Sequence, residues 1–130
     1  MKAPMMNSVS IVATSLLTLA LAGCGGGGGE KPAAANAALA SCVACHSFKE
    51  GGPRSIGPNL YGIIGKTAGT QQGFTYSQRM KESGLVWTRE SLDAFLASPR
   101  KVIPGTRMGY LGMADPAARQ AAIAAMATSK

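Results

Sequence analysis

Two cysteines and the only histidine of the chain lie close together, in the run Cys42-Val43-Ala44-Cys45-His46. This C-x-x-C-H pattern is typical of covalent haem attachment. Two thiols about one helical turn apart can bond to the two vinyl-derived carbons on one edge of a porphyrin. The adjacent imidazole can then bind the iron from one face of the ring. The sequence therefore predicts one covalently attached haem c.

Three other kinds of site use the same residue types. A thioredoxin-like C-x-x-C normally lies in a βαβ context, which this sequence lacks. A zinc site needs about four ligands, and beyond Cys42, Cys45 and His46 the chain offers at most an acidic residue. A structural disulfide between the two cysteines is the third alternative, in an oxidising compartment. The pentapeptide and an export signal together favour haem.

The export signal is predicted at residues 1–23. Lys2 is followed by an uncharged run, whose most apolar stretch is residues 9–22. A helix of about 14 residues rises only about 21 Å, which is short of the roughly 30 Å hydrocarbon core. We therefore interpret residues 1–23 as a secretory signal peptide rather than a membrane span.

The end of this signal, Leu21-Ala22-Gly23-Cys24, resembles the lipobox of bacterial lipoproteins. The resemblance implies cleavage before Cys24, which becomes the lipid-modified N-terminus. Ordinary cleavage after Ala22 is the alternative, with Cys24 left as a free thiol. Residues 24–32 include five consecutive glycines, so we expect a flexible, lipid-anchored tether. Residues 33–130 then form the single folded domain.

Composition limits what this domain can be. The chain has 130 residues, of which 5% are aromatic and 17 are glycine, so a core of side chains alone would be thin. Its net charge is +7, which becomes +6 once Lys2 leaves with the signal. Such a surface favours acidic partners. Nucleic-acid binding is excluded as a function for an exported chain with so few aromatic residues.

The local patterns predict helices separated by glycine-rich loops. Nine of the 29 residues in 47–75 are Gly or Pro, which makes a long loop reasonable only if it wraps a large cofactor. Capping residues mark several helix starts. Helices are expected over 32–43, over 77–83 with Gly84 after it, from Thr88 until Pro99 ends it, and from Asp115-Pro116 towards Thr128.

A second axial iron ligand cannot be histidine, because His46 is the only one. After removal of the signal, four methionines remain, namely Met80, Met108, Met113 and Met126. Met108 lies in a turn-rich segment, where a loop can present its side chain across a haem ring. We interpret the other three as packing residues. A thioether ligand favours ferrous iron and raises the reduction potential.

Several motifs together resemble those of the class I c-type cytochromes, in particular the mitochondrial type. Residues 57–62 read GPNLYG, residues 73–77 read GFTYS, Trp87 follows, and residues 104–108 read PGTRM. The similarity spans residues 34–128, in family-like order and separation. It implies an all-α fold, the small cytochrome c fold, with about four to five helices and long loops around one covalently attached haem.

The resemblance also implies roles for single residues. The Pro58 carbonyl is expected to accept the free ring N–H of His46, and Met108 is expected to be the second axial ligand. Three side chains should bind the haem propionates: Tyr76, Trp87 and Thr106. Lys66 stands at the basic position near them, and Tyr110 takes the aromatic place beside the methionine.

Two departures from the family pattern are predicted to matter. Phe95 stands where many relatives have a tyrosine that reaches the methionine ligand, so that hydrogen bond is missing. On the first helix, Ala34 and Ala38 stand where the family usually has a glycine and an aromatic residue. On the last helix, Ala122 and Ala125 stand where the family normally has larger residues. Their crossing should bury less apolar area, which implies closer helix approach or lower stability.

These features together predict a one-electron carrier rather than an enzyme. With both axial positions filled, the iron has no vacant site for a small-molecule substrate. The expected location is the periplasmic side of the cell membrane, with a lipid anchor at Cys24 and respiratory redox complexes with acidic docking surfaces as partners. Two alternatives are a haem peroxidase-like or gas-binding protein and a haem relay subunit of a larger oxidase or dehydrogenase complex.

Overall fold

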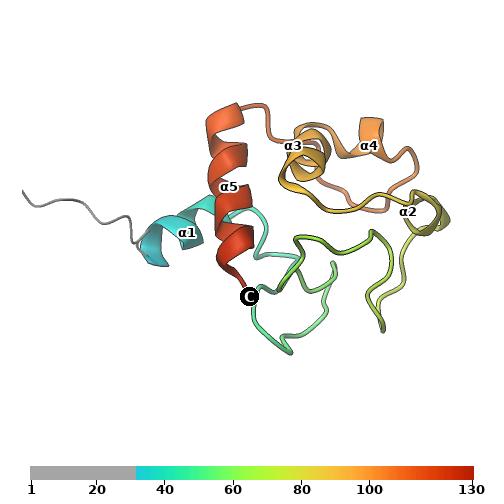
Figure 1. The fold of residues 1–130 in the computed structure, drawn as a ribbon, viewed down its shortest axis with the longest axis horizontal. Helices are drawn as coiled ribbons and strands as arrows, with labels where there is room; N and C mark the ends of the chain where they lie inside the picture. Colours follow the sequence, from blue (N-terminus) through green and yellow to red (C-terminus); the bar gives the residue numbers. More distant parts are fainter. Residues whose placement is uncertain (1–31) are drawn as a thin grey trace, which may run out of the picture.

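The computed structural model describes residues 32–130 of the chain (Figure 1). The predicted signal peptide at 1–23, the lipidation site Cys24 and nearly all of the tether at 24–32 lie outside the described residues. None of the helices between residues 32 and 130 is long and apolar enough to cross a membrane.

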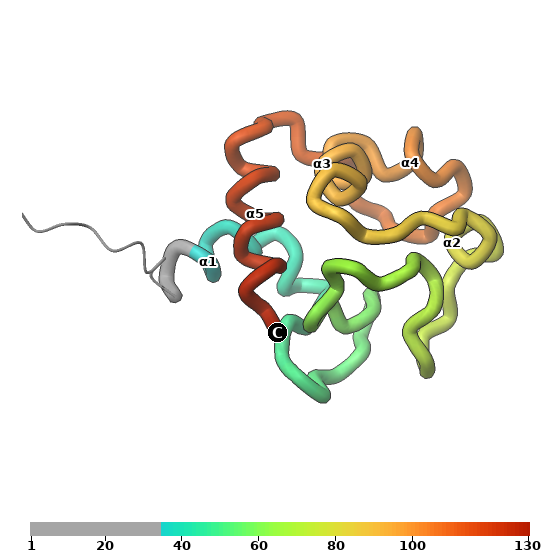
Figure 2. The backbone as a smooth tube through the Cα atoms, viewed as in Figure 1, coloured from blue at the N-terminus to red at the C-terminus, as the bar shows by residue number. Residues whose placement is uncertain are grey.

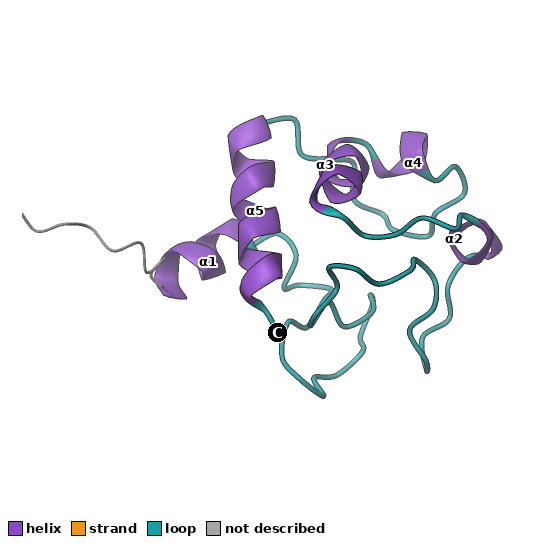
Figure 3. Cartoon of the chain, viewed as in Figure 1, coloured by secondary structure: helices purple, strands orange, loops and turns teal. Residues whose placement is uncertain are grey.

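The described part of the chain is all-α, as the sequence predicts, and contains five helices joined by long loops (Figure 3). The only β-type pairing between residues 32 and 130 is a single bridge, Thr67 with Val86. The helices are α1 (Pro32–Ala38), α2 (Gln78–Glu82), α3 (Arg89–Ala97), α4 (Pro99–Val102) and α5 (Pro116–Thr128).

Side-chain caps begin three of the four helices that the sequence predicts. Ser77 accepts a hydrogen bond from the Met80 amide at the start of α2. At α3, Thr88 and Ser91 each accept from the other's backbone N–H, at 3.1 and 2.8 Å, which completes a capping box. Asp115 accepts from the Ala117 amide at 3.0 Å to begin α5. Each cap pairs a backbone donor that the helix itself leaves free.

Two helix boundaries differ from the prediction. The helix expected over 32–43 ends at Ala38, and the chain continues in turns. The amide of Cys42 donates to the Leu39 carbonyl at 2.8 Å, three residues back, which is the hydrogen bond of a 3₁₀ turn. Serine, cysteine and valine are weak helix formers, which favours this ending. Pro99, expected only to end a helix, also occupies the first turn of α4, where its missing N–H costs nothing.

The core forms where α5 packs against both α1 and α3 (Figure 2). Trp87 and Phe95 meet edge to face in it, with ring centroids 5.0 Å apart. Ile123 and Met126 of α5 are fully buried. The other buried apolar residues are Leu39, Ala68, Met80, Leu92, Leu96, Ile103, Ala122 and Ala125.

Alanines make much of the contact between α1 and α5. Ala122 and Ala125 of α5 are buried, and Ala35 and Ala38 of α1 pack partly buried against the core. Small side chains bury little apolar area, and so α1 gains correspondingly little from this contact.

Residues 47–76 form no helix, and the bridge at Thr67 is their only β-type pairing. Backbone hydrogen bonds nevertheless connect this loop to distant parts of the chain. The Gly62 amide donates to the Ser129 carbonyl at 2.6 Å, and the Ala68 amide donates to the Leu85 carbonyl at 2.7 Å. The loop therefore has defined attachments to the end of α5 and to the segment that precedes α3.

Candidate haem-binding site

The C-x-x-C-H run forms the turn that follows α1. The amides of Cys45 and His46 both donate to the Cys42 carbonyl, at 3.0 and 2.9 Å. Cys42 and Cys45 are half-buried free thiols. Burial raises the pKa of the Cys42 thiol, and the hydroxyl of Ser41 opposes this effect. The turn presents two thiols and an imidazole within one short stretch of backbone.

His46 is oriented by a backbone carbonyl. Its Nδ1 lies 2.7 Å from the Pro58 oxygen, the contact that the family resemblance implies. A carbonyl oxygen only accepts, so Nδ1 must carry the proton, which leaves the lone pair of Nε2 free for a metal. Burial lowers the pKa of His46, although the Pro58 carbonyl opposes this, and the ring is therefore held in the neutral form that binds metals.

Gly57 makes room for this imidazole. A Cβ atom at Gly57 would lie 2.6 Å from Nδ1 and 2.8 Å from Nε2 of His46, closer than real Cβ contacts allow. The Gly57 amide also donates to the Cys45 carbonyl at 2.9 Å. The backbone thus forms a close-fitting wall behind the ring, and this cradle together with the two thiols fits a covalently attached haem.

Asn59 holds the loop that carries Pro58, a role that the sequence reasoning missed. The side chain is buried, and its amide nitrogen donates to the carbonyls of Lys49 and Gly52 at 2.8 and 3.2 Å. Its oxygen accepts from the Tyr61 amide at 2.9 Å. An asparagine inside a Gly-Pro-rich loop is the signal that could have revealed it, because such side chains pair with nearby backbone groups.

Met108 is partly buried and packs against the core cluster, as Cys42 and Tyr76 do. Its amide donates to the Thr106 hydroxyl at 3.3 Å, and the Thr106 amide donates to the Ile103 carbonyl at 3.0 Å. Three predicted site residues from separate parts of the sequence therefore border one core.

The other methionines of the described chain occupy different surroundings. Met80 and Met126 are buried in the core, where they pack against apolar neighbours, and Met113 is partly buried. The burial of Met80 and Met126 fits their interpretation as packing residues, whereas Met113 has the same intermediate burial as Met108.

Trp87 and Tyr76 are both anchored by neighbours. The backbone of Trp87 accepts from the Gly65 amide at 2.8 Å and donates to the Lys66 carbonyl at 2.9 Å. Tyr76 meets the ring of Phe74 edge to face at 4.8 Å. Burial raises the pKa of the Tyr76 hydroxyl, and the backbone of Gln71 opposes that rise. Tyr76 thus remains a neutral hydrogen-bond donor at physiological pH.

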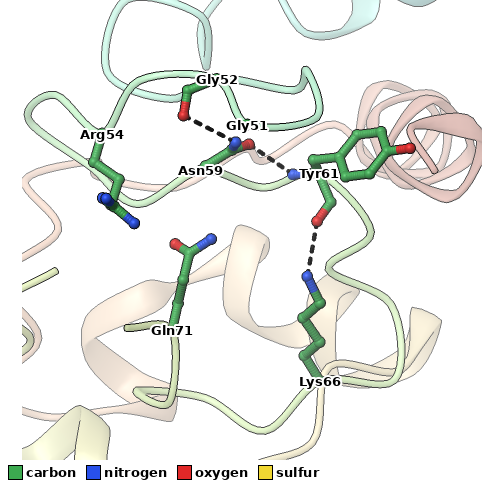
Figure 4. A pocket seen from close by; sticks show the side chains of 7 residues that line it. All are labelled: Gly51, Gly52, Arg54, Asn59, Tyr61, Lys66 and Gln71. Atoms are coloured by element: carbon green, nitrogen blue, oxygen red, sulfur yellow. Dashed lines mark hydrogen bonds between the residues drawn. The ribbon is translucent and has the colours of Figure 1, made fainter. Parts of the chain in front are cut away.

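A cavity of about 320 Å³ opens beside Lys66 (Figure 4). Lys66 Nζ donates to the Tyr61 carbonyl at 2.9 Å, and Arg54 donates to the Gln72 carbonyl at 2.9 Å. Gln71 presents a buried oxygen that has no partner among the described residues. The lining residues are Gly51, Gly52, Arg54, Asn59, Tyr61, Lys66 and Gln71. Both charged side chains of this cavity are cationic, so it favours acidic groups.

Several known proteins are similar to this chain in sequence. No family model matches the chain. A cytochrome c homolog of Bradyrhizobium diazoefficiens is 45% identical over 89 residues, which are 68% of this chain but only 48% of that protein, so the chain spans about half of its length. Cytochrome c2 of Rhodopila globiformis is 40% identical over 89 residues, which cover 68% of this chain and 83% of that protein.

A solved structure is also similar. Cytochrome cH from Methylobacterium extorquens superposes with a TM-score of 0.68 at 39% sequence identity. The superposition covers 74% of this chain and 96% of that one. The likeness in sequence and the likeness in fold therefore point to the same group of proteins.

Proposed function

The chain belongs to the class I c-type cytochromes, and on that premise we propose that it is a one-electron carrier whose haem iron is bound by His46 and Met108. As a family member it carries one covalently attached haem c and is an electron-transfer protein rather than an enzyme. Bound haem c supplies an iron that gains and loses one electron. The observation that carries the assignment of His46 is the orientation of its imidazole, whose Nδ1 lies 2.7 Å from the Pro58 oxygen, next to two free thiols.

Cys42 and Cys45 attach the cofactor. On attachment, each thiol would add across one vinyl group, so that an S–H bond would be exchanged for an S–C bond and the hydrogen would go to the other vinyl carbon. No oxidant is needed for this addition. The amides of Cys45 and His46 both bond back to the Cys42 carbonyl, so one short turn carries both thiols.

His46 and Met108 fill the two axial positions in this proposal. The Pro58 carbonyl fixes the imidazole tautomer and makes the ring a better donor. The Thr106 hydroxyl accepts a hydrogen bond from the Met108 amide. This bond helps to fix the loop that carries the Met108 thioether. Two occupied positions leave no vacancy for a substrate, which suits electron transfer.

Three further side chains are proposed to bind the haem propionates: Tyr76, Trp87 and Thr106. Tyr76 retains its proton, because burial raises its pKa, and can therefore donate to a carboxylate. The indole N–H of Trp87 is likewise a donor on a ring that Phe95 holds in place. Lys66 and Arg54 add positive charge near the cavity of Figure 4.

We place the protein at the periplasmic side of the cell membrane. The sequence pattern supports this through the signal at 1–23, the lipobox cysteine Cys24 and the glycine tether at 24–32. Two or more acyl chains anchor a protein stably, whereas a single chain is marginal. The domain at 33–130 could then swivel above the membrane without leaving it.

Respiratory redox complexes with acidic docking surfaces are the proposed partners. The supporting observation is a set of exposed cationic side chains, which attract an acidic face and lose that attraction as salt rises. These residues are Lys49, Lys66, Arg100, Lys101 and Arg107.

Intact mass spectrometry together with an optical spectrum of the matured protein tests the assignment. We expect haem to stay with the polypeptide under acid–acetone extraction, and the ferric spectrum to show the red-end band of an iron–methionine bond. Met108→Ala should abolish that band, whereas Met80→Leu should keep it. Extractable pigment would refute the covalent link.

Two other outcomes would contradict the proposal of a one-electron carrier and favour another function. Ferric protein that lacks the band and binds cyanide at once would be a peroxidase-like or gas-binding protein. Co-purification with a membrane complex after mild detergent extraction would indicate a haem relay subunit.

A further inference from the structure

Arg119 of α5 joins three segments of the chain. Its Nε donates to Oδ1 of Asp93 on α3 at 2.9 Å, and one terminal nitrogen lies 3.5 Å from Oδ2. The other terminal nitrogen donates to the carbonyls of Met113 and Ala114, at 2.8 and 3.0 Å. The side chain is only 12% exposed. A single guanidinium thus links α5, α3 and the loop between α4 and α5.

The same loop contacts the end of α3 through its backbone. The Met113 amide donates to the Leu96 carbonyl at 2.8 Å, which pairs one of the carbonyls that a helix end leaves free. Gly112 has φ +123°, and a Cβ there would overlap the carbonyl of Ala97. The loop passes beside α3 on its way to α5 (Figure 2). Residues 112–114 are therefore attached to α3 and α5 at several points.

We propose that Arg119 is a positioning residue for Met108, an inference that rests on the proposed role of Met108 as iron ligand. Met108 lies only five residues before Met113, a span of at most about 17 Å when extended. Thr106 shapes the chain on the other side of Met108. Arg119 holds the far end, so the thioether is presented by a loop that is tied at both sides.

Asp93 and Gln120 complete the arrangement around Arg119. The carboxylate of Asp93 accepts from Arg119 and also from Gln120, at 3.0 Å. Asp93 therefore orients the guanidinium, which leaves one nitrogen directed at the loop carbonyls. Gln120 contacts Asp93 without a hydrogen bond to the loop, and it serves as a neighbouring control.

The test is imidazole binding to the ferric holoprotein, since a neutral added ligand competes with methionine for the iron. Arg119→Gln should bind imidazole about tenfold more tightly, because loss of charged hydrogen bonds of this kind favours loop opening. Its red-end band should weaken in parallel. Gln120→Ala should stay within about twofold of wild type.

A control that destabilises α3 at another place separates positioning from general destabilisation. Thr88→Ala removes the side-chain cap of α3 and so lowers the stability of the fold. It leaves the hydrogen bonds to Met113 and Ala114 in place. If Arg119→Gln shows the imidazole affinity of Thr88→Ala, Arg119 only supports the fold and the proposal is overturned.

Milder variants keep the proposal testable if Arg119→Gln does not accumulate as holoprotein. Asp93→Asn replaces the carboxylate that accepts from Arg119 by a neutral amide. Arg119→Lys keeps the charge but cannot reach both the Met113 and the Ala114 carbonyl while it pairs with Asp93. Each should bind imidazole about threefold more tightly than Thr88→Ala, and equal affinity would overturn the proposal.

The optical spectrum of the wild-type protein tests the proposed role of Met108 as iron ligand independently of the variants. A wild-type spectrum without the red-end band would refute Met108 as ligand, whatever the variants do.

Discussion

At the scale of single residues, the site depends on a glycine, because only a residue without a side chain fits beside the His46 ring. Gly57 lies against the face of His46, and the next residue, Pro58, supplies the carbonyl that receives the ring proton. Asn59 follows and ties this loop to Lys49 and Gly52. Three consecutive residues thus provide space, orientation and rigidity for one imidazole. Each does so with a different property: no Cβ, a free carbonyl, and an amide side chain.

We expect Gly57→Ala to lower the melting temperature and the yield of holoprotein. The added Cβ overlaps the His46 ring, so the ring or the loop must move, at a cost of about 1–3 kcal/mol. That corresponds to a drop of about 4–8 °C for each kcal/mol. Gly109→Ala is the matched control, because a Cβ there meets no atom within 4 Å. Equal melting temperatures for the two variants would contradict the crowding.

At the scale of elements, α5 contacts α1 and α3 by different means. Its contact with α1 depends on alanines, of which Ala122 and Ala125 are buried. Its contact with α3 includes the ion pair between Arg119 and Asp93. The first contact should therefore respond to added apolar volume, and the second should respond to pH.

Ala38→Phe tests the contact between α1 and α5. A larger side chain at this partly buried position should add apolar burial and raise the stability by about 1–2 kcal/mol. The readout is thermal unfolding of the holoprotein. Ala37→Phe serves as the control, because position 37 is exposed and should gain nothing. No gain, or a loss, for Ala38→Phe relative to this control would show that the crossing is already well packed.

Asp93 should make the stability depend on pH in the acidic range. The hydrogen bond from Arg119 lowers the pKa of Asp93 below its ordinary value of 3.8. The ionised carboxylate therefore stabilises the fold above that value, and this stabilisation is lost as the pH falls through the folded pKa. We expect Asp93→Asn to melt below wild type at pH 7, with a difference that shrinks below about pH 4. A difference that stays constant to about pH 2 would assign the loss to amide geometry instead of charge.

At the scale of the whole molecule, positive charge is widespread. The chain has 13 Lys and Arg against 6 Asp and Glu, and many of the cationic side chains are exposed. Like charges on a small surface create a positive potential that extends over about one Debye length, roughly 10 Å at 0.1 M salt. Such a field accelerates encounters with anions and slows encounters with cations.

Two small iron and ruthenium complexes measure this field. Oxidation of the ferrous protein by hexacyanoferrate(III) should slow by about tenfold when ionic strength rises from about 10 to about 200 mM. Reduction of the ferric protein by hexaammineruthenium(II) should instead become faster, because salt screens the repulsion between cations. Stopped-flow absorbance gives both rates. The same salt dependence for the two complexes would mean that surface charge does not steer the approach.

Local signals in the sequence determined the all-α class, the helix starts and the haem attachment run. Thr88 and Asp115 cap helices through backbone groups two or three residues away, so their effect can be predicted without any tertiary contact. The same holds for the spacing of Cys42 and Cys45. The spacing of two residues in a motif and the capping of a helix depend only on residues that are close in the sequence. Both can therefore be predicted from the sequence alone.

Only the tertiary structure decided the contacts between distant residues. Arg119 of α5 pairs with Asp93 of α3, 26 residues earlier in the chain. The role of Asn59 depended on which carbonyls the folded loop brings within reach. A polar side chain such as that of Asn59 or Arg119 can form hydrogen bonds of similar energy with many groups of the unfolded chain. Its native partner is selected only when packing of the whole domain excludes the others.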